Sequence, residues 1–396
     1  MTRALRTARN GTILTFVLAG LLCGTFTVRV PALAERLRLP ESSVGLVLLL
    51  WGIGALVTMQ LMRLVMARVG SRGVLRAAAP LSAASLGLVA VAPSFPVLLI
   101  AAMIFGMAFG ALDVAMSAQG STVERAYDRP LMSGMHAGWC VGAISAGLLG
   151  TAAIATGLSF TAHLLIVALA SLPASVALSR TYLPDAASGN APEGRRGRLP
   201  AVVYLLGAVM FAAFMVEGVV ADWNGLYLIG TLRAPEALAA LGYPVFEAGM
   251  LVARLRGDRL RGRYGARRLI VFSGGATAVA FLAVIAAPSA PVAVAGMFLI
   301  GLSVATISPM TVSLAGTATA DPGPAIAQAG AMGYAGLLLG PVVIGFLSAA
   351  ASLRAAMGTA VVLGVLIAVA ARFLPSSRTA PAERPAPAEE QLQLAA

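Results

Sequence analysis

Long apolar runs separated by short polar breaks follow one another from the start of the chain to about residue 375. Each run has some twenty residues, enough for a helix to cross a hydrocarbon core of ~30 Å. Inside lipid the backbone must satisfy its own hydrogen bonds, so runs of this length predict helices rather than strands. The pattern therefore predicts an all-α polytopic membrane protein with twelve transmembrane helices. They are expected near residues 11–33, 42–66, 74–92, 96–121, 131–156, 159–180, 200–229, 236–255, 267–287, 291–316, 324–351 and 353–374.

The polar breaks also divide the chain into larger units. Residues 1–180 are expected to form an N-terminal six-helix bundle and residues 200–375 a C-terminal one. Between them, 181–199 is too polar to span a membrane and is predicted to be a cytoplasmic linker. The segment 376–396 is rich in Pro, Ala and Glu, a composition typical of a disordered tail.

Composition and charge agree with this division. Hydrophobic residues make up 59% of the chain, charged residues 11%, and mean hydropathy is +0.89, which excludes an ordinary soluble protein. The net charge of +12 comes from arginines that fall mostly in alternate loops: 23 of the 28 lie on one side if both termini share that side. By the positive-inside rule that side is the cytoplasm of a bacterial inner membrane. The charge thus indicates topology and predicts no nucleic-acid partner.

Motifs of enzymes and ATP-driven pumps are absent from the sequence. It contains no P-loop, so neither ATP hydrolysis nor an ATPase subunit is implied. Neither the two cysteines nor the two histidines have metal-ligand or catalytic spacing. We predict no enzyme activity, no cofactor and no metal site.

A short loop motif repeats in the two expected bundles. Arg68-Val-Gly70-Ser-Arg72 follows the second predicted helix, and Arg263-Tyr-Gly265-Ala-Arg267 follows the eighth, at the equivalent place in the second half. Parallel six-helix repeats are the architecture of one large class of transporters.

These loops resemble the signature of the major facilitator superfamily, and the resemblance covers essentially the whole chain. In that family the loops latch the two halves together in one conformation. The first copy lacks the family's acidic residue, which is replaced by Ala67, whereas the second copy is richer. The resemblance implies a conformational latch made by Arg68, Gly70, Arg72, Asp258, Arg259, Arg263 and Gly265.

Further stretches resemble a bacterial branch related to fucose permease and the MosC-like membrane proteins. They include Arg29-Val-Pro31, Leu112-Asp-Val114, Ser133-Gly-Met-His136 and Glu217 to Trp223. An Asn common in that branch is Ser117 here, so the branch's substrates do not transfer to this chain.

Ionisable groups at membrane depth are costly unless they face water or a partner, so each is a functional candidate. Asp113 falls in the fourth predicted helix, which the resemblance implies lines a central cavity together with the first, seventh and tenth. It is a candidate for binding protons or solute, against a purely structural carboxylate. His136, in the fifth helix, either pairs with Asp113 as a proton relay or is a neutral packed imidazole.

The seventh predicted helix is the densest polar stretch. Glu217 is expected near the membrane middle, with Asp222, Trp223 and Asn224 towards its outer end. Trp223 is interpreted either as a surface for stacking a solute or as an interfacial anchor. Asp222 is equally suited to binding, capping or gating.

Three other polar residues complete the candidates. Glu247 either tunes substrate choice or pairs with Arg254, two helical turns away. Arg29 either clamps an anionic solute, forms a salt bridge with Asp222, or reaches the interface. Gln328 in the eleventh helix is a weaker candidate, as is Tyr334.

These features favour a secondary active transporter that moves a small solute by alternating access, coupled to protons. A sugar-like or other polar metabolite is favoured over a drug, because the fifth helix lacks the proline found in the drug antiporters of the family. Efflux by an antiporter is the alternative, and a non-transporting receptor or scaffold of the same fold is the alternative of another class. The expected partners are the solute, protons and the lipid bilayer, and the chain is expected to be a monomer.

Overall fold

The computed structural model describes residues 3–127, 131–184, 199–316, 318 and 322–375. Twelve segments in this part of the chain are long and apolar enough to cross a membrane, which confirms the predicted all-α polytopic class. The helices are α1 (Arg3–Val28), α2 (Val30–Leu37), α3 (Glu41–Val91), α4 (Phe95–Tyr127), α5 (Met132–Ala155), α6 (Phe160–Leu178), α7 (Ala201–Gly230), α8 (Glu236–Ala239), α9 (Gly242–Tyr264), α10 (Ala266–Ile285), α11 (Ala290–Val304), α12 (Ile307–Gly316), α13 (Pro322–Ala350) and α14 (Leu353–Ala371).

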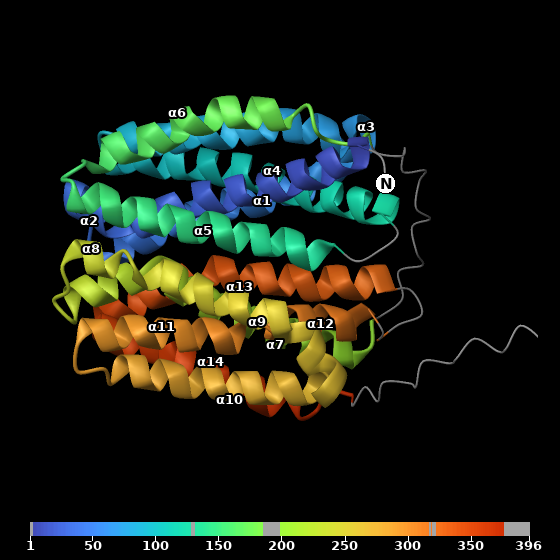
Figure 1. Ribbon diagram of the computed structural model, residues 1–396. Coiled ribbons are helices and arrows are strands. Elements are labelled where there is room, and N and C mark those ends of the chain that lie inside the picture. Colours follow the sequence, from blue (N-terminus) through green and yellow to red (C-terminus); the bar gives the residue numbers. More distant parts are fainter. Residues whose placement is uncertain (1–2, 128–130, 185–198, 317, 319–321, 376–396) are drawn as a thin grey trace, which may run out of the picture.

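The long helices run roughly parallel in two groups (Figure 1). The first half, α1–α6, occupies one side of the molecule, and the second half, α7–α14, occupies the other. Helix α3 contains two spans, and α11 with α12 forms a single one. The domain boundaries at 180 and 200 stay a prediction, and the proposed tail at 376–396 lies outside the described residues.

The repeated loop motif has the same backbone conformation in both halves. Gly70 breaks α3 with φ 70° and ψ 168°, and Gly265 separates α9 from α10 with φ 78° and ψ 154°. This region of positive φ with extended ψ is accessible essentially only to glycine. In each half, the glycine of the motif therefore allows the backbone to turn between two helices.

Close helix packing is also repeated, at the interval that separates the two loop motifs. A Cβ added at Gly106 would overlap the Trp51 carbonyl, and one added at Gly301 would overlap the Phe246 carbonyl. Gly54 and Gly249 are related in the same way, against the carbonyls of Met103 and Phe298. Small residues let membrane helices approach until backbones touch. Glycine pairs thus hold equivalent helices together in the two halves.

The first predicted helix ends earlier than the expected residue 33. Helix α1 stops at Val28, and the short helix α2 follows, with Pro31 in its first turn. Proline has no backbone N–H and is well accommodated at a helix start but not in its interior. The sixth span begins the same way in each half, with Ser159 and Ser352 accepting a hydrogen bond from the backbone N–H three residues on.

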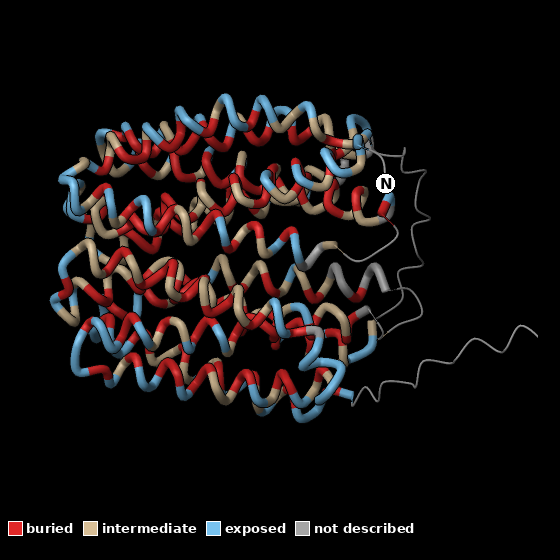
Figure 2. The backbone as a smooth tube through the Cα atoms, in the orientation of Figure 1, coloured by how far each residue is buried: buried red, intermediate tan, exposed pale blue. Residues whose placement is uncertain are grey.

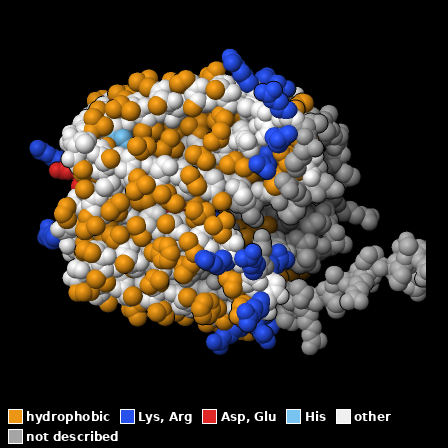
Figure 3. Space-filling model, in the orientation of Figure 1, with side chains coloured by type: hydrophobic (Ala, Val, Ile, Leu, Met, Phe, Trp, Pro, Cys, Tyr) orange, Lys and Arg blue, Asp and Glu red, His pale blue; other side chains and the backbone are white. Residues whose placement is uncertain are grey.

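The surface of the molecule is apolar around its sides. Figure 2 shows exposed residues along the outer edges of the helices, and the large side chains of Ile100, Leu169 and Phe272 are 62, 64 and 73% exposed. Arginines gather at one end of the molecule in Figure 3. This arginine-rich end carries the two loop motifs, and the arginine-poor end carries Arg29, Glu236 and Arg354. A belt of apolar side chains between charged ends is suited to a lipid bilayer.

Candidate functional site

A cavity of about 560 Å³ lies between the two halves. Its walls come from α1, α3, α4 and α5 of the first half and α7, α9, α12 and α13 of the second. Four carboxylates from the predicted candidates line it: Asp113, Glu217, Asp222 and Glu247. The structure therefore brings together acids from opposite halves of the sequence.

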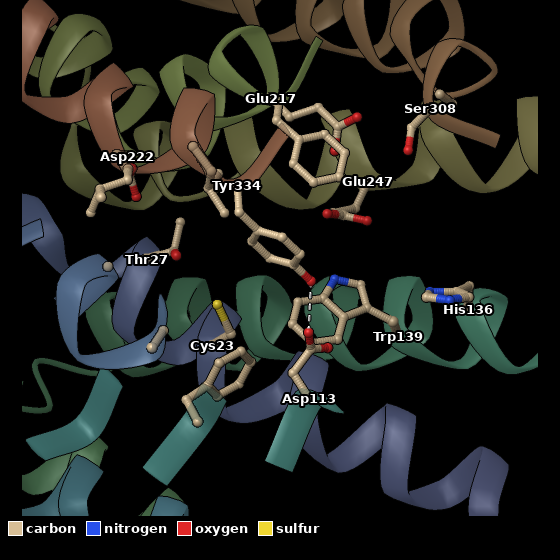
Figure 4. Close-up of a pocket in the computed structure, with 18 of the residues that line it drawn as sticks. Cys23, Thr27, Asp113, His136, Trp139, Glu217, Asp222, Glu247, Ser308 and Tyr334 are labelled. Atoms are coloured by element: carbon tan, nitrogen blue, oxygen red, sulfur yellow. Dashed lines mark hydrogen bonds between the residues drawn. The ribbon is translucent and has the colours of Figure 1, made fainter. Parts of the chain in front are cut away.

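Asp113 is bonded across the cavity to the opposite half. The Tyr334 hydroxyl, on α13, donates a hydrogen bond to Asp113 Oδ2, on α4, at 2.9 Å (Figure 4). The Tyr334 ring is held edge-on by Phe214 of α7, with ring centroids 5.7 Å apart. A hydrogen bond to an ionised acceptor is stronger than one between neutral groups. The charge on Asp113 therefore bears directly on how firmly the two halves are joined here.

Arg254 forms a second link between the halves. Its Nη1 lies 3.0 Å from Cys140 Sγ, so α9 contacts α5 through a guanidinium–sulfur hydrogen bond. The predicted direct pair between Arg254 and Glu247 is not the contact that Arg254 makes in this structure. Two turns of helix separate the two residues, and the thiol on the facing helix is within easier reach of the guanidinium.

Aromatic rings cover the first half's side of the cavity. Trp51, Phe105 and Phe109 contact one another with centroids 5.7–6.4 Å apart. Phe109 also meets Trp139 edge-on at 5.7 Å. Trp51, Phe109 and Trp139 line the cavity and offer ring surfaces to a solute. We call Trp51, Phe105, Phe109 and Trp139 the aromatic wall.

His136 lines the cavity but does not contact Asp113 in the expected way. Its ring packs edge-on against Phe16, with centroids 5.0 Å apart, and the residue is exposed. In Figure 4 its side chain lies well away from Asp113. The proposed relay pair is therefore not formed here, because Tyr334 is the partner of Asp113.

Trp223 and Asn224 are placed outside the cavity lining. Trp223 is fully buried, and its ring lies against Gly345 of α13. The Asn224 amide donates to the Val220 carbonyl of its own helix. Successive residues of a helix point about 100° apart, so neighbours of the cavity-lining Asp222 face the bundle interior instead. The interpretation of Trp223 as a stacking surface for solute is thus wrong for this conformation.

Arg29 and Gln328 also lie outside the cavity lining. The Arg29 guanidinium pairs with Glu236 of the second half, with Nη1 and Oε1 3.6 Å apart, and not with Asp222, which was one of the three alternatives. Burial lowers the pKa of Arg29, and the charge of Glu236 raises it. Glu236 starts α8, which the chain places beside the turn between α1 and α2 at the arginine-poor end. Gln328 lies in α13, partly buried, towards the arginine-rich end.

The cavity is closed at the arginine-poor end. There the halves touch through the Arg29–Glu236 pair, through Pro31 against Gly225, and through Gly147 against Pro244. Towards the arginine-rich end the lining residues His136 and Pro309 are exposed. The cavity is therefore accessible from the arginine-rich end.

The predicted latch residues all lie at this accessible end. Arg68, Arg259 and Arg263 are exposed, and the Arg263 guanidinium lies 5.3 Å from the ring of its neighbour Tyr264. Gly70 and Gly265 form the breaks already described. Arg72 is partly buried, and Asp258 lies on α9. Their role as a latch stays a prediction.

Several lining residues had no signal in the sequence. The aromatic wall, Cys23, Tyr243 and Met59 are uncharged, and apolar or aromatic residues are ordinary in a membrane helix. The acids were predicted as candidates only because they are ionisable residues within apolar segments. Among the described residues, no group of three or more His, Cys, Asp or Glu is placed to hold a metal ion.

The chain matches known transporters along its length. The family model of the Major Facilitator Superfamily matches residues 12–320 and 205–396. An uncharacterized transporter of Sinorhizobium fredii is 32% identical over 361 residues, which cover 89% of this chain and 94% of the relative. Membrane protein MosC of Rhizobium meliloti is 27% identical over 348 residues, covering 86% and 84%.

The fold is shared with transporters of known structure. The crystal structure of a D-xylose–proton symporter superposes with a TM-score of 0.78 at 17% identity, covering 94% of this chain and 98% of that one. The family and the Sinorhizobium relative are transporters and not enzymes. The predicted resemblance to the superfamily, including MosC, is confirmed. This chain, with its twelve candidate spans and two-sided cavity, belongs to the major facilitator superfamily of membrane transporters.

Proposed function

We propose that the protein moves a small solute, sugar-like or another polar metabolite, across the bacterial inner membrane by proton-coupled alternating access. The arginine-rich end, with both termini, faces the cytoplasm, as the positive-inside rule requires. The conformation described is then open to the cytoplasm. The D-xylose–proton symporter of the same fold, by its name, couples sugar movement to protons.

The hydrogen bond between Tyr334 and Asp113 carries the proposal for coupling. It joins α13 to α4, so it must break or rearrange when the two halves rock about the cavity. Ionised Asp113 accepts a strong hydrogen bond and holds the halves together. Protonation removes the charge and weakens this link, so proton binding favours the exchange between conformations.

The test compares coupled and uncoupled movement of one solute. A thermal-shift screen of purified protein with a metabolite library supplies the solute. Proteoliposomes loaded with a pH-sensitive dye then report proton movement when the solute is added. For Asp113→Asn we expect solute-driven proton movement to be lost, because the Asn amide oxygen can still accept the Tyr334 hydrogen bond but the side chain cannot bind and release a proton. Exchange of labelled solute across the membrane, which needs no net proton movement, should persist.

Two variants make the result specific. Tyr334→Phe removes only the hydroxyl and should weaken coupling in the same direction. Glu35→Gln changes an exposed carboxylate on α2, away from the cavity, and should behave like the wild type. Unchanged proton movement in Asp113→Asn would remove Asp113 from the coupling mechanism.

Efflux in exchange for protons is the second candidate. The aromatic wall supports it, because ring surfaces also suit apolar solutes. The same dye assay distinguishes the two, since symport and antiport move protons in opposite directions relative to the solute. A receptor or scaffold of this fold would bind a solute and give no flux.

A further inference from the structure

The cavity carries an excess of negative groups. Among the described residues, its lining contains four carboxylates and a single guanidinium, that of Arg254. Asp113 has the Tyr334 hydroxyl as a partner, and Arg254 donates to the Cys140 thiol. The remaining acids, Glu217, Asp222 and Glu247, all come from the second half. A buried cluster of this sign favours cations over anions.

Among the described residues, Glu247 is the cavity acid that keeps a buried carboxylate oxygen without a hydrogen-bond partner. The residue is 4% exposed, and its Oε2 is buried with no hydrogen-bond partner among the described residues. The Tyr243 hydroxyl and the Cys140 thiol lie beside the carboxylate without satisfying that oxygen. Burying an ionised carboxylate without a partner costs roughly several kcal/mol. A partner supplied by the solute would therefore strongly stabilise the complex.

The surroundings of Glu247 suit an organic cation. In Figure 4 its carboxylate points into the space between the halves, towards the side where Trp139 and the Tyr334–Asp113 pair lie. Trp139 belongs to the aromatic wall, whose ring faces attract cations in addition to packing against apolar atoms. A charged amine can therefore contact an acid of the second half while the rest of the solute lies on rings of the first half.

We propose that Glu247 binds a cationic amine of the solute, and that the cargo is a ring-bearing organic amine. This deepens the proposed function by naming the substrate class of the same cavity. A neutral polyol would donate hydroxyl hydrogen bonds to Glu247 but leave its charge offset only by the Arg254 guanidinium, which also interacts with Glu217. An anionic solute would meet four acids with one guanidinium to offset them.

The test uses pairs of probes that differ mainly by the charged amine. Full-length protein in detergent is titrated with 2-phenylethylamine or 2-phenylethanol, and separately with glucosamine or glucose. Two readouts are recorded: the unfolding temperature, and the fluorescence of Trp51 and Trp139 at the cavity. In at least one pair the amine should bind about tenfold or more tightly than its neutral partner, as expected for a desolvated charge pair.

Variants connect the binding to one carboxylate. Glu247→Gln keeps the shape and removes the charge, and it should weaken amine binding at least about tenfold and binding of the neutral probes much less. Glu247→Asp keeps the charge and should retain part of the preference, which controls for misfolding. Glu35→Gln on exposed α2 should bind like the wild type. Equal binding of amine and neutral probes, or full amine binding by Glu247→Gln, would overturn the proposal.

Failure here is distinguishable from failure of the proposed function. A neutral solute that drives proton-coupled flux would leave transport intact and refute the amine class. Amine binding that depends on Glu247, without any flux in proteoliposomes, would support the site and refute transport.

Discussion

Gly106 packs against the Trp51 carbonyl in the first half, and at the equivalent position of the second half Gly301 packs against the Phe246 carbonyl. The same sequence interval relates Gly70 to Gly265, with nearly the same backbone angles. The frame of the molecule is thus repeated at the level of individual backbone contacts. Such contacts tolerate little change, because a helix cannot approach another more closely than its side chains allow.

The cavity side chains at equivalent positions are different. By the same interval Asp113 corresponds to Ser308, Gly52 to Glu247, and Met59 to Arg254, and all six residues line the cavity. Each half presents four Phe, Tyr or Trp side chains to the cavity, but the first half adds a single acid, whereas the second adds three acids and a guanidinium. A repeated frame can therefore hold an uneven distribution of charge, with most ionisable side chains of the cavity on the second half.

The largest effect is expected where the shared frame itself is broken. Gly106→Val and Gly301→Val each place side-chain atoms on a facing backbone carbonyl. Overpacking of this kind costs about 3 kcal/mol, which should lower the unfolding temperature of a chain of this length by roughly 4 °C. Thermal unfolding followed by scattering or fluorescence in detergent measures it.

Gly275→Val is the matched control, because a Cβ at this helical glycine meets nothing within 4 Å. It should change stability little. If the loss of stability in Gly106→Val and in Gly301→Val differed by more than about twofold, the helix packing of the two halves would not be equivalent.

The next largest effect, on proton-coupled flux, is expected when a cavity acid is moved from the first half to the equivalent position of the second. The double variant Asp113→Ser with Ser308→Asp keeps the number of acids and moves one to the equivalent position. The new Asp lies on α12 and lacks the Tyr334 hydroxyl as its partner, so proton-coupled flux should fall about tenfold or more. If the dye assay showed that coupling is retained, the total charge of the cavity would determine coupling, and it would not matter which half carries the acid.

The smallest effect is expected at the arginine-poor end, where Arg29 and Glu236 join the halves. Arg29→Gln removes one ion pair, between a buried guanidinium and the partly exposed Glu236 carboxylate. At about 1 kcal/mol, its loss should raise the population open at this end about fivefold. Spin labels at Glu35→Cys and Arg354→Cys, in a background lacking Cys23 and Cys140, report the opening as longer distances. An unaltered distance distribution would assign closure to the glycine and proline contacts alone.

Much of the fold follows from the sequence, because hydropathy directly reports which segments lipid accepts. The twelve spans and the equivalence of the two loop motifs were predicted in this way. Local stereochemistry explains the exception in α1, which ends at Val28 because Pro31 starts a new helix. A single residue causes this break, so hydropathy averaged over a window of some twenty residues does not detect it.

The site was predictable only in part. Asp113, Glu217 and Glu247 were identified because an acidic side chain at membrane depth is energetically costly and is therefore a candidate for a functional role. Trp223 was misplaced because closeness in sequence to Asp222 says nothing about which face of the helix it occupies. The partners were the least predictable: Tyr334 for Asp113, Cys140 for Arg254 and Glu236 for Arg29 each come from the opposite half of the chain. Only the packing of the two halves brings them together.

The glycines of α3 that face the second half have a consequence for synthesis of the chain. Gly45 and Gly52 lie against Pro341 and Leu338 of α13, which is made much later than α3. At about 5–20 residues per second, the ribosome completes α13 some tens of seconds after α3. During that interval a narrow groove along α3 faces lipid or the insertion machinery, and the last third of the chain must find it. Until α13 is made, this face of α3 therefore lacks the helix that covers it in the complete transporter.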